Sequence, residues 1–277
     1  MELRELQLFE LKMLKDITKA CEENGIEYYL ACGTMLGAVR HGGFIPWDDD
    51  IDLYMTVKNY KRFRKIGQKI LGEKYFVQNY LSEKEYFEQW TKVVANGTTA
   101  LSEQLKNWNV NHGISIDVFP IIGLSSDPSE IARQQKAFEL NRALLSDFFM
   151  KATNQQFTVK QRLLYLIPRT IRKFICRLNE KRFLLDNEKY EKTTEIWWKI
   201  YNEYPTAVFA EKEKIKFEDG YFYAMKDVDG YLSRKFGDYM TLPPESQRVG
   251  HDASGWGKII YDLNKDYSEY IYEDTKE

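Results

Sequence analysis

The chain has 277 residues, of which 43% are hydrophobic, a size and composition suited to one substantial globular core. Its 40 basic and 42 acidic residues leave a net charge of -2, which excludes a whole-protein field that would attract nucleic acid. Three widely spaced cysteines exclude a disulfide framework and a zinc pattern, and no apolar run approaches the roughly 20 residues that span a bilayer. We therefore expect a cytoplasmic protein with buried thiols and no nucleic-acid partner.

The first half of the chain alternates short strands with helices. Apolar residues at helical spacing predict a helix at 3–24, which Gly25 can end, and another at 57–71 with Thr56 as its N-cap. A further short helix opens at Gly33-Thr34. Strands are predicted at residues 27–32, 50–55, 75–78, 92–95 and 114–119.

Two local signals mark the ends of the later strands. Asn96-Gly97 is a strong tight-turn pair, so residues 92–101 are predicted to form a β-hairpin. Pro120 is predicted to end the strand at 114–119, because proline donates no hydrogen bond to a sheet.

The pattern changes after Leu124. Helical periodicity runs through 127–150 and 161–204 with few turn residues, interrupted by Pro168 and Asn179. The chain is therefore predicted to combine an α/β amino-terminal half with a mainly helical carboxy-terminal half.

Three alternating aspartates, Asp48, Asp50 and Asp52, form the first candidate site. On an extended strand their side chains would share one face at spacings of about 6 to 7 Å, and they would repel one another unless a cation lay among them. Hard oxygen ligands suit Mg²⁺ or Mn²⁺. Asp49 would face the other way and is less suited as a ligand.

The acidic run has two other interpretations. A solvated acidic loop is the common outcome for such a run taken alone. A calcium loop also begins with aspartates at positions one, three and five, but Leu53 and Asn59 stand where that loop needs glycine and glutamate. The apolar strand after the aspartates and the glycine turn before them favour the metal site.

That glycine turn has the features of a phosphate cradle. Gly33 offers no side chain to obstruct a phosphate, Thr34 offers a hydroxyl, and a helix start presents unpaired N–H groups. Arg40 could add a bidentate contact. Glycine is common at such turns for steric reasons alone, so the signal gains weight only beside the aspartates.

Asp117 is the candidate for a further carboxylate. It is the only charged residue in 113–124, within a predicted strand of apolar residues, where an uncompensated charge is unfavourable. Such a residue would complete a two-metal clamp or accept a proton from an attacking hydroxyl. Pairing with a buried arginine is the structural alternative.

The sequence resembles the LicD family of phosphocholine and related phosphotransferases, a branch of the nucleotidyltransferase superfamily that includes fukutin-related proteins. The resemblance rests on GTMLGAVRHGGFIPWDDDIDLYM, on HGISIDVFP, and on GYLSRKFGDYMTLPPESQRVGH at 230–251. It covers about residues 10 to 251 and implies an α+β fold. Residues 1–125 would form a nucleotidyltransferase-like core with a mixed sheet and flanking helices, and 126–277 a mainly helical region packed on it.

The resemblance also implies the chemistry. Gly33 and Thr34 would meet the nucleotide phosphates. The implied metal ligands for Mg²⁺ are Asp48, Asp50, Asp52 and Asp117, and the implied catalytic residues are Asp50, Asp52 and Asp117. The donor would be a CDP-linked alcohol such as CDP-choline, the acceptor a hydroxyl of a surface glycan precursor, and CMP the leaving group. Asp117 or Asp50 would take the acceptor's proton.

Two further regions carry expectations. Residues 157–182 hold eight Lys or Arg residues against one Glu, interleaved with apolar residues, which is typical of a basic amphipathic helix at a membrane surface or of a soluble helix with a basic outer face. A helix at the membrane surface would suit a lipid-linked glycan acceptor at the inner face of the membrane. Arg248 and His251 are candidate phosphate-binding residues, with purely structural roles as the alternative.

Two rival functions remain at this stage. One is a nucleotide-sugar glycosyltransferase with an Asp-x-Asp metal site, and the other is a domain that binds nucleotide or glycan without catalysis. The transferred alcohol is open among choline, ethanolamine, glycerol and ribitol.

Overall fold

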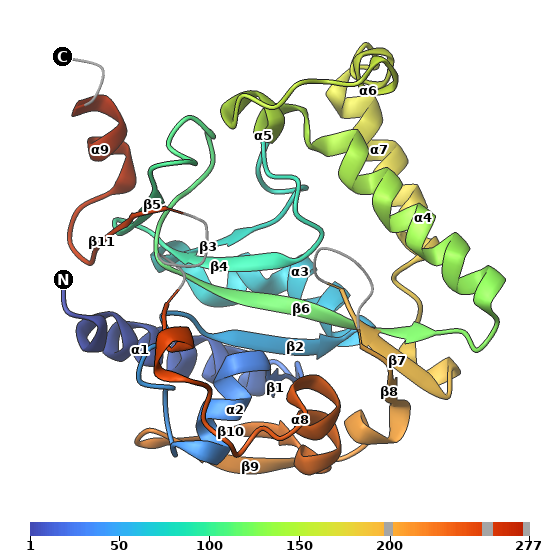
Figure 1. Ribbon diagram of the computed structural model, residues 1–277. Helices are drawn as coiled ribbons and strands as arrows, with labels where there is room; N and C mark the ends of the chain where they lie inside the picture. Colours follow the sequence, from blue (N-terminus) through green and yellow to red (C-terminus); the bar gives the residue numbers. More distant parts are fainter. Residues whose placement is uncertain (197–201, 251–256, 274–277) are drawn as a thin grey trace.

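A mixed seven-stranded sheet forms the centre of the protein in this computed structural model, which describes residues 1–196, 202–250 and 257–273 (Figure 1). Five strands follow the order β1-β2-β6-β4-β3, while β7 pairs with β6 and β8 pairs with β7. The strands are β1 Tyr29–Leu30, β2 Asp52–Thr56, β3 Tyr75–Gln78, β4 Thr91–Ala95, β6 Ser115–Leu124, β7 Lys192–Glu195 and β8 Tyr204–Pro205.

The helices of the first half lie where the periodicity places them. These are α1 Leu3–Glu23, α2 Cys32–Arg40 and α3 Val57–Leu71. Helix α1 ends before Gly25, whose φ of 61° is the left-handed conformation that favours glycine. Thr56 occupies the N-cap of α3 without a side-chain capping hydrogen bond. Both α1 and α3 pack against β6, so their apolar stripes help to form the main core.

Strand β6 runs past Pro120, so the prediction that this proline ends the strand is wrong. Residues before Pro120 pair with β4 and residues after it pair with β7, both antiparallel. Pro120 thus lies where the antiparallel neighbour changes, a position at which the missing N–H group is tolerated. On its other edge β6 pairs in parallel with β2 over residues 117–121, on both sides of Pro120.

The predicted hairpin at 92–101 is also wrong. Gly97 does form the turn, with a φ of 75°. However, β4 pairs with β3 and β6, whereas β5 (Thr99–Ser102) pairs with β11 (Ile259–Asp262) from the end of the chain. Figure 1 shows β11 beside β5, which brings the carboxy-terminal segment to the edge of the amino-terminal half.

The region after residue 125 is not mainly helical, which corrects the expectation for 126–277. Its helices are α4 Pro128–Leu145, α5 Asp147–Ala152, α6 Val159–Leu164, α7 Arg169–Asn179, α8 Val228–Phe236 and α9 Tyr267–Glu273. Its strands are β7, β8 and β11 together with the hairpin of β9 Lys212–Phe217 and β10 Gly220–Met225. Single-turn 3-10 helices lie at Gly72–Lys74, Glu180–Arg182, Asn187–Lys189, Thr206–Phe209 and Glu245–Gln247.

The helical spacing predicted through 161–204 is wrong beyond Arg182, where the chain continues through the 3-10 turn Asn187–Lys189 into strand β7. Residues Lys192–Glu195 form an added strand of the central sheet in which all but Lys192 are buried, and this tertiary pairing overrides local periodicity. All three cysteines are buried, as expected. Within the described residues, no helix is long and apolar enough to cross a membrane.

Candidate active site

Two aspartates face each other at the centre of the sheet. Asp52 opens β2, and its Cα partner in the parallel strand β6 is Asp117. Neighbouring strands lie about 4.8 Å apart, so paired residues place their side chains on the same face. Asp52 is buried, and burial, together with the charges of Asp50 and Asp117, raises its carboxyl pKa well above the ordinary value.

Lys92 compensates part of this negative charge. It is the antiparallel Cα partner of Asp117 on β4, and its Nζ lies 3.0 Å from Asp117 Oδ1. Burial lowers the pKa of Lys92, but the charge of Asp117, the hydrogen bond to it, and the charges of Glu88 and Asp50 together outweigh burial, so the pKa is raised. Asp117 therefore lies between a carboxylate on one side and an ammonium on the other, and its partner is a lysine rather than the arginine considered above.

The first turn of α2 positions both Asp52 and Asp48. Thr34 is buried, and its hydroxyl oxygen accepts a hydrogen bond from the Asp52 N–H at 2.9 Å. A Cβ atom on Gly33 would lie 2.6 Å from Asp48 Oδ2, so only glycine allows that carboxylate to lie there. The Cys32 N–H is taken by the Tyr231 hydroxyl, and the N–H groups of Gly33 and Thr34 follow it in the first helical turn.

The acidic run is not an extended strand over its whole length. Asp48 to Ile51 precede β2, so the alternation expected for Asp48, Asp50 and Asp52 does not hold there. Asp49 and Asp50 both line the same cavity as Asp52, while Asp48 lies against Gly33. The buried Asp49 accepts a hydrogen bond from the Tyr261 hydroxyl at 2.9 Å, which gives it a structural partner.

A cavity of about 250 Å³ opens beside these carboxylates. Its lining includes Asp50, Asp52, Asp117 and Lys92. Aromatic side chains and two buried glutamates also line it: Tyr86, Trp90, Trp108, Phe149, Tyr261, Glu10 and Glu88. The Tyr86 and Trp108 rings stack at an interplanar angle of 12°. The cavity thus brings acidic and aromatic side chains together around one space.

Both glutamates of the cavity are buried, and within the described residues each has one carboxyl oxygen, Oε2, without a hydrogen-bond partner. Burial raises the pKa of Glu88 to about 8. Burial and the nearby charges of Asp50 and Asp49 raise the pKa of Glu10 well above its ordinary range. Unpartnered carboxyl oxygens inside an aromatic cavity offer sites to a cationic or hydrogen-bonding ligand.

Two of the three other candidate residues, Arg40 and Arg248, lie in the described part of the chain. Arg40 is at the end of α2, not at its start, and donates a hydrogen bond to the Tyr239 carbonyl oxygen at 2.9 Å. Burial and the nearby positive charge of Arg248 lower its pKa. The Arg248 guanidinium lies 5.6 Å from the centre of the Trp47 ring, next to Asp48 in sequence. His251 lies outside the described residues.

A buried polar network supports the cradle from below. The Glu195 carboxylate on β7 accepts hydrogen bonds from the Tyr54 hydroxyl at 2.6 Å and from Lys235 Nζ at 2.6 Å. The Tyr54 hydroxyl in turn contacts Cys32 Sγ at 3.3 Å and the Tyr231 hydroxyl at 3.4 Å. Tyr231 and Lys235, from α8, thereby tie the carboxy-terminal signature to the start of α2.

Comparison with known proteins places this site in a family. The model of the LicD/FKTN/FKRP nucleotidyltransferase domain matches residues 25–174. The chain belongs to this family. It is 27% identical over 261 residues to the lipopolysaccharide cholinephosphotransferase LicD of Haemophilus influenzae, covering 90% of this chain and 95% of that protein. It is also 33% identical over 70 residues to the ribitol 5-phosphate transferase FKRP of human and mouse, covering 24% of this chain and 14% of those proteins.

The chain is thus a LicD-family transferase, and the matched domain contains the cradle, the aspartates and Lys92. Tyr231, Lys235 and Tyr261 lie beyond the domain, so later segments of the chain complete the site. Among the described residues, no three His, Cys, Asp and Glu side chains are grouped so that they could hold a metal ion. The four aspartates of this LicD-family site therefore stay predicted ligands.

Sequence reasoning missed several residues of the LicD-family site. Glu10 falls on the buried face of α1 between Leu6 and Leu14, and an acidic residue at a core position of a helix is a signal that could have been used. Lys92, in a predicted strand, is a similar signal. Glu88, Trp90 and Trp108 come from segments without a periodic pattern, so only the folded chain brings them to the cavity.

Proposed function

We propose that this protein transfers a phospho-alcohol, choline phosphate in particular, from a CDP-linked donor to a hydroxyl of a cell-surface glycan precursor. The transfer would use Mg²⁺ or Mn²⁺ and take place in the cytoplasm. Family membership supports the reaction class, and the relatives named above transfer choline phosphate and ribitol 5-phosphate by their names. The observation that carries the choice of alcohol is the cavity, which is lined by the central aspartates, aromatic rings and two buried glutamates.

Choline suits this cavity for a physical reason. Aromatic faces attract quaternary ammonium groups, and desolvated cation–π contacts contribute about 2 kcal/mol. Only two carbons separate the ammonium group of choline phosphate from its phosphate. An aromatic site for the ammonium must therefore lie next to the phosphorus that reacts. Trp108 and Glu88 line the same cavity as Asp52 and Asp117, so the ammonium can enter while the phosphate stays near the aspartates. A polyol would instead need several hydroxyl partners.

The proposed reaction exchanges one bond to phosphorus for another. The acceptor hydroxyl attacks the phosphorus that carries the alcohol, a new bond from that phosphorus to the acceptor oxygen forms, and the bond to the CMP oxygen breaks. CMP leaves with the bonding electron pair. Asp117 or Asp50 takes the proton of the hydroxyl. The metal ion, when bound, neutralises charge on the phosphoryl oxygens.

The chain's own residues would orient the donor. The N–H groups of Gly33 and Thr34 would bind phosphate oxygens at the start of α2. Arg40 and Arg248, which lie close enough for their charges to interact, would add positive charge for the CMP phosphate. The oxygen donors of Asp50, Asp52 and Asp117 fit Mg²⁺ chemically, and a bound cation would relieve the repulsion that raises the pKa of Asp52.

A donor panel tests the proposal. The purified protein is given CDP-choline, CDP-ribitol or CDP-glycerol with Mg²⁺ and a lipopolysaccharide or teichoic acid acceptor, and the nucleotide product is identified. We expect CMP, with CDP-choline as the best donor. At 100 times its dissociation constant, a bound donor should stabilise the protein by about 2.7 kcal/mol. Release of a nucleoside diphosphate from a sugar nucleotide would instead favour a glycosyltransferase and overturn the proposal.

A variant and its matched control test whether the transferred alcohol is choline. Because the pKa of Glu88 is about 8, its carboxylate is ionised above that pH, where Glu88→Gln removes a negative charge from the cavity. In an assay at about pH 9 we therefore expect kcat/KM for CDP-choline to fall about tenfold or more, with little change for CDP-ribitol. Glu103→Gln, an exposed position, is the control. Equal losses for both donors would argue against an ammonium in this cavity while leaving the phosphotransfer reaction itself intact.

A further inference from the structure

An exposed apolar surface covers α6, the turn after it, and α7. We call it the α6–α7 face. It consists of Val159, Leu163, Leu166, Ile171, Phe174 and Leu178, whose exposed fractions range from 49% to 78%. Figure 1 shows α6 and α7 at the outer edge of the molecule, with α7 beside α4 and away from the central sheet. Large apolar side chains gathered in this way mark an interaction site.

Helix α7 is inverted relative to an ordinary surface helix. Its buried residues are polar or small, namely Arg172, Cys176 and Asn179. Its solvent side carries the apolar residues Ile171, Phe174 and Leu178 at helical spacing. A helix that only covered a core would present these two faces the other way round.

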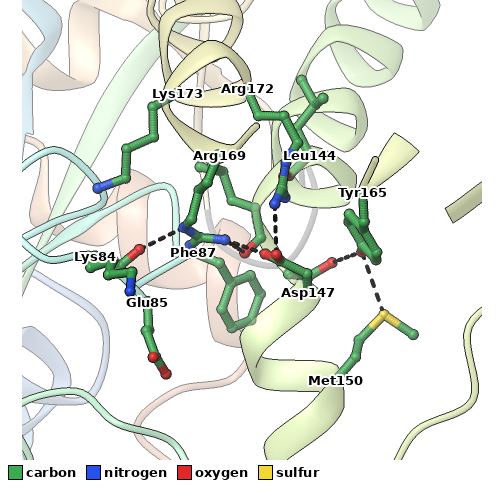
Figure 2. A network of polar contacts seen from close by, with 12 residues as sticks. Lys84, Glu85, Phe87, Leu144, Asp147, Met150, Tyr165, Arg169, Arg172 and Lys173 are labelled. Carbon is green, nitrogen blue, oxygen red and sulfur yellow. Dashed lines mark hydrogen bonds and ion pairs between the residues drawn. The ribbon is translucent and has the colours of Figure 1, made fainter. Parts of the chain in front are cut away.

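A buried polar network fixes this orientation. The Asp147 carboxylate forms ion pairs with Arg169 and Arg172, the latter at 2.6 Å (Figure 2). Arg169 also donates a hydrogen bond to the Lys84 carbonyl oxygen at 2.6 Å. Asn179 donates to the Ala137 carbonyl oxygen at 2.7 Å. Turning the apolar face inward would leave these buried charges unpaired, so the fold holds it outward.

The exposed charges within the segment that carries the α6–α7 face have one sign. Between 157 and 182, every exposed charged residue is basic: Lys160, Arg162, Arg177, Lys181 and Arg182. The one acidic residue, Glu180, is buried and lies 2.6 Å from Arg64. Apolar side chains flanked by basic ones complement the acyl and headgroup layers of a bilayer that contains anionic lipids.

We propose that the α6–α7 face docks the protein on the surface of a membrane that contains anionic lipids. The apolar side chains enter the headgroup boundary, and the basic residues contact lipid phosphates. The helices lie on the surface and do not cross it, since α6 has 6 residues and α7 has 11. The inference does not depend on which alcohol is transferred, because none of these six residues lines the cavity.

Vesicle co-sedimentation tests the proposal with the full-length protein. Vesicles of phosphatidylcholine alone are compared with vesicles that also contain phosphatidylglycerol, at low and high salt. The double variant Leu166→Glu/Phe174→Glu removes two apolar contacts, and Tyr221→Glu, 63% exposed on β10, is the matched control. We expect wild type and control to sediment with the anionic vesicles, and the double variant to bind about tenfold or more weakly.

A second variant separates charge from apolar contact. Arg177→Gln/Lys181→Gln/Arg182→Gln should weaken binding to anionic vesicles about tenfold or more and make the remaining binding insensitive to salt. Unchanged thermal melting of both variants would show that they fold. Absence of wild-type binding to anionic vesicles, or equal binding of wild type and double variant, would overturn the proposal. So would a wild-type dimer that Leu166→Glu/Phe174→Glu converts to a monomer without any lipid binding, because a second copy would then cover the face.

Discussion

Asp52 and Asp117 are Cα partners in the parallel strands β2 and β6, and Lys92 on β4 flanks Asp117 from the other side. Three residues from distant parts of the sequence thus form one row across the sheet. This row places two carboxylates together where burial and mutual repulsion raise the pKa of Asp52. The carboxylate pair is held by the backbone ladder rather than by a mobile loop, which suits a site that must position charge.

Neutralising either member of this pair should separate activity from stability. Asp52→Asn and Asp117→Asn should each lower CMP release at least about 100-fold, because a carboxylate that orients metal or accepts a proton is lost. In metal-free buffer, Asp52→Asn should raise the free energy of unfolding by about 1 kcal/mol, since it removes a repelled buried charge. CMP assays and urea denaturation measure the two quantities. The exposed Asp219→Asn is the control, and wild-type activity in both variants would refute the catalytic assignment.

Gly33→Ala tests the close approach of the cradle to Asp48. The added Cβ would lie 2.6 Å from Asp48 Oδ2, so the carboxylate must move. Because alanine favours a helix over glycine, the free energy of unfolding should change by less than about 1 kcal/mol while the transfer rate falls about tenfold or more. Gly67→Ala on α3, where the nearest atom would be 3.3 Å away, is the matched helical control. A fully active Gly33→Ala enzyme would show that this approach has no role in transfer.

The raised pKa of Glu88 should make the free energy of unfolding depend on pH. Its pKa is about 8 in the folded protein and 4.5 as the ordinary reference. Between these values the folded state binds more protons than the unfolded state, so raising the pH destabilises the protein by up to about 1.4 kcal/mol per unit. Glu88→Gln should remove this contribution. Chemical denaturation of the metal-free protein at several pH values measures it, and equal slopes for wild type and variant would contradict the prediction.

Because Lys235 and Glu195 form a buried ion pair, we expect substitutions at these two positions to have non-additive effects on the free energy of unfolding. Their side chains are 8% and 3% exposed, so Lys235→Met leaves a buried carboxylate without its cation and should cost about 3 to 5 kcal/mol of stability. Lys235→Met/Glu195→Gln should recover much of that loss. Denaturation of the single variants and the double variant gives the coupling energy. Additive effects of the two substitutions would mean that the pair contributes nothing beyond its separate members.

The local parts of the fold follow closely from the sequence. The apolar periodicity of α1 and α3 predicts both helices, with their ends within about two residues of the observed ones. The lone charge of Asp117 in an apolar strand marks it as unusual before any partner is known. In contrast, the supposed hairpin at 92–101 and the helix through 192–195 were wrong. Turn signals and short periodic windows do not encode which distant strand becomes a neighbour.

By itself, the sequence determined the family, because the glycine turn and the acidic run that carry the resemblance are contiguous and are recognised by residue type. Only the tertiary structure decided what surrounds that chemistry. Pairing of β2, β6 and β4 aligned Asp52, Asp117 and Lys92, and folding of separate segments brought Glu88 and Trp108 to one cavity. The physical reason is that burial and charge compensation arise between residues distant in the chain, whereas periodicity reports only on neighbours along it.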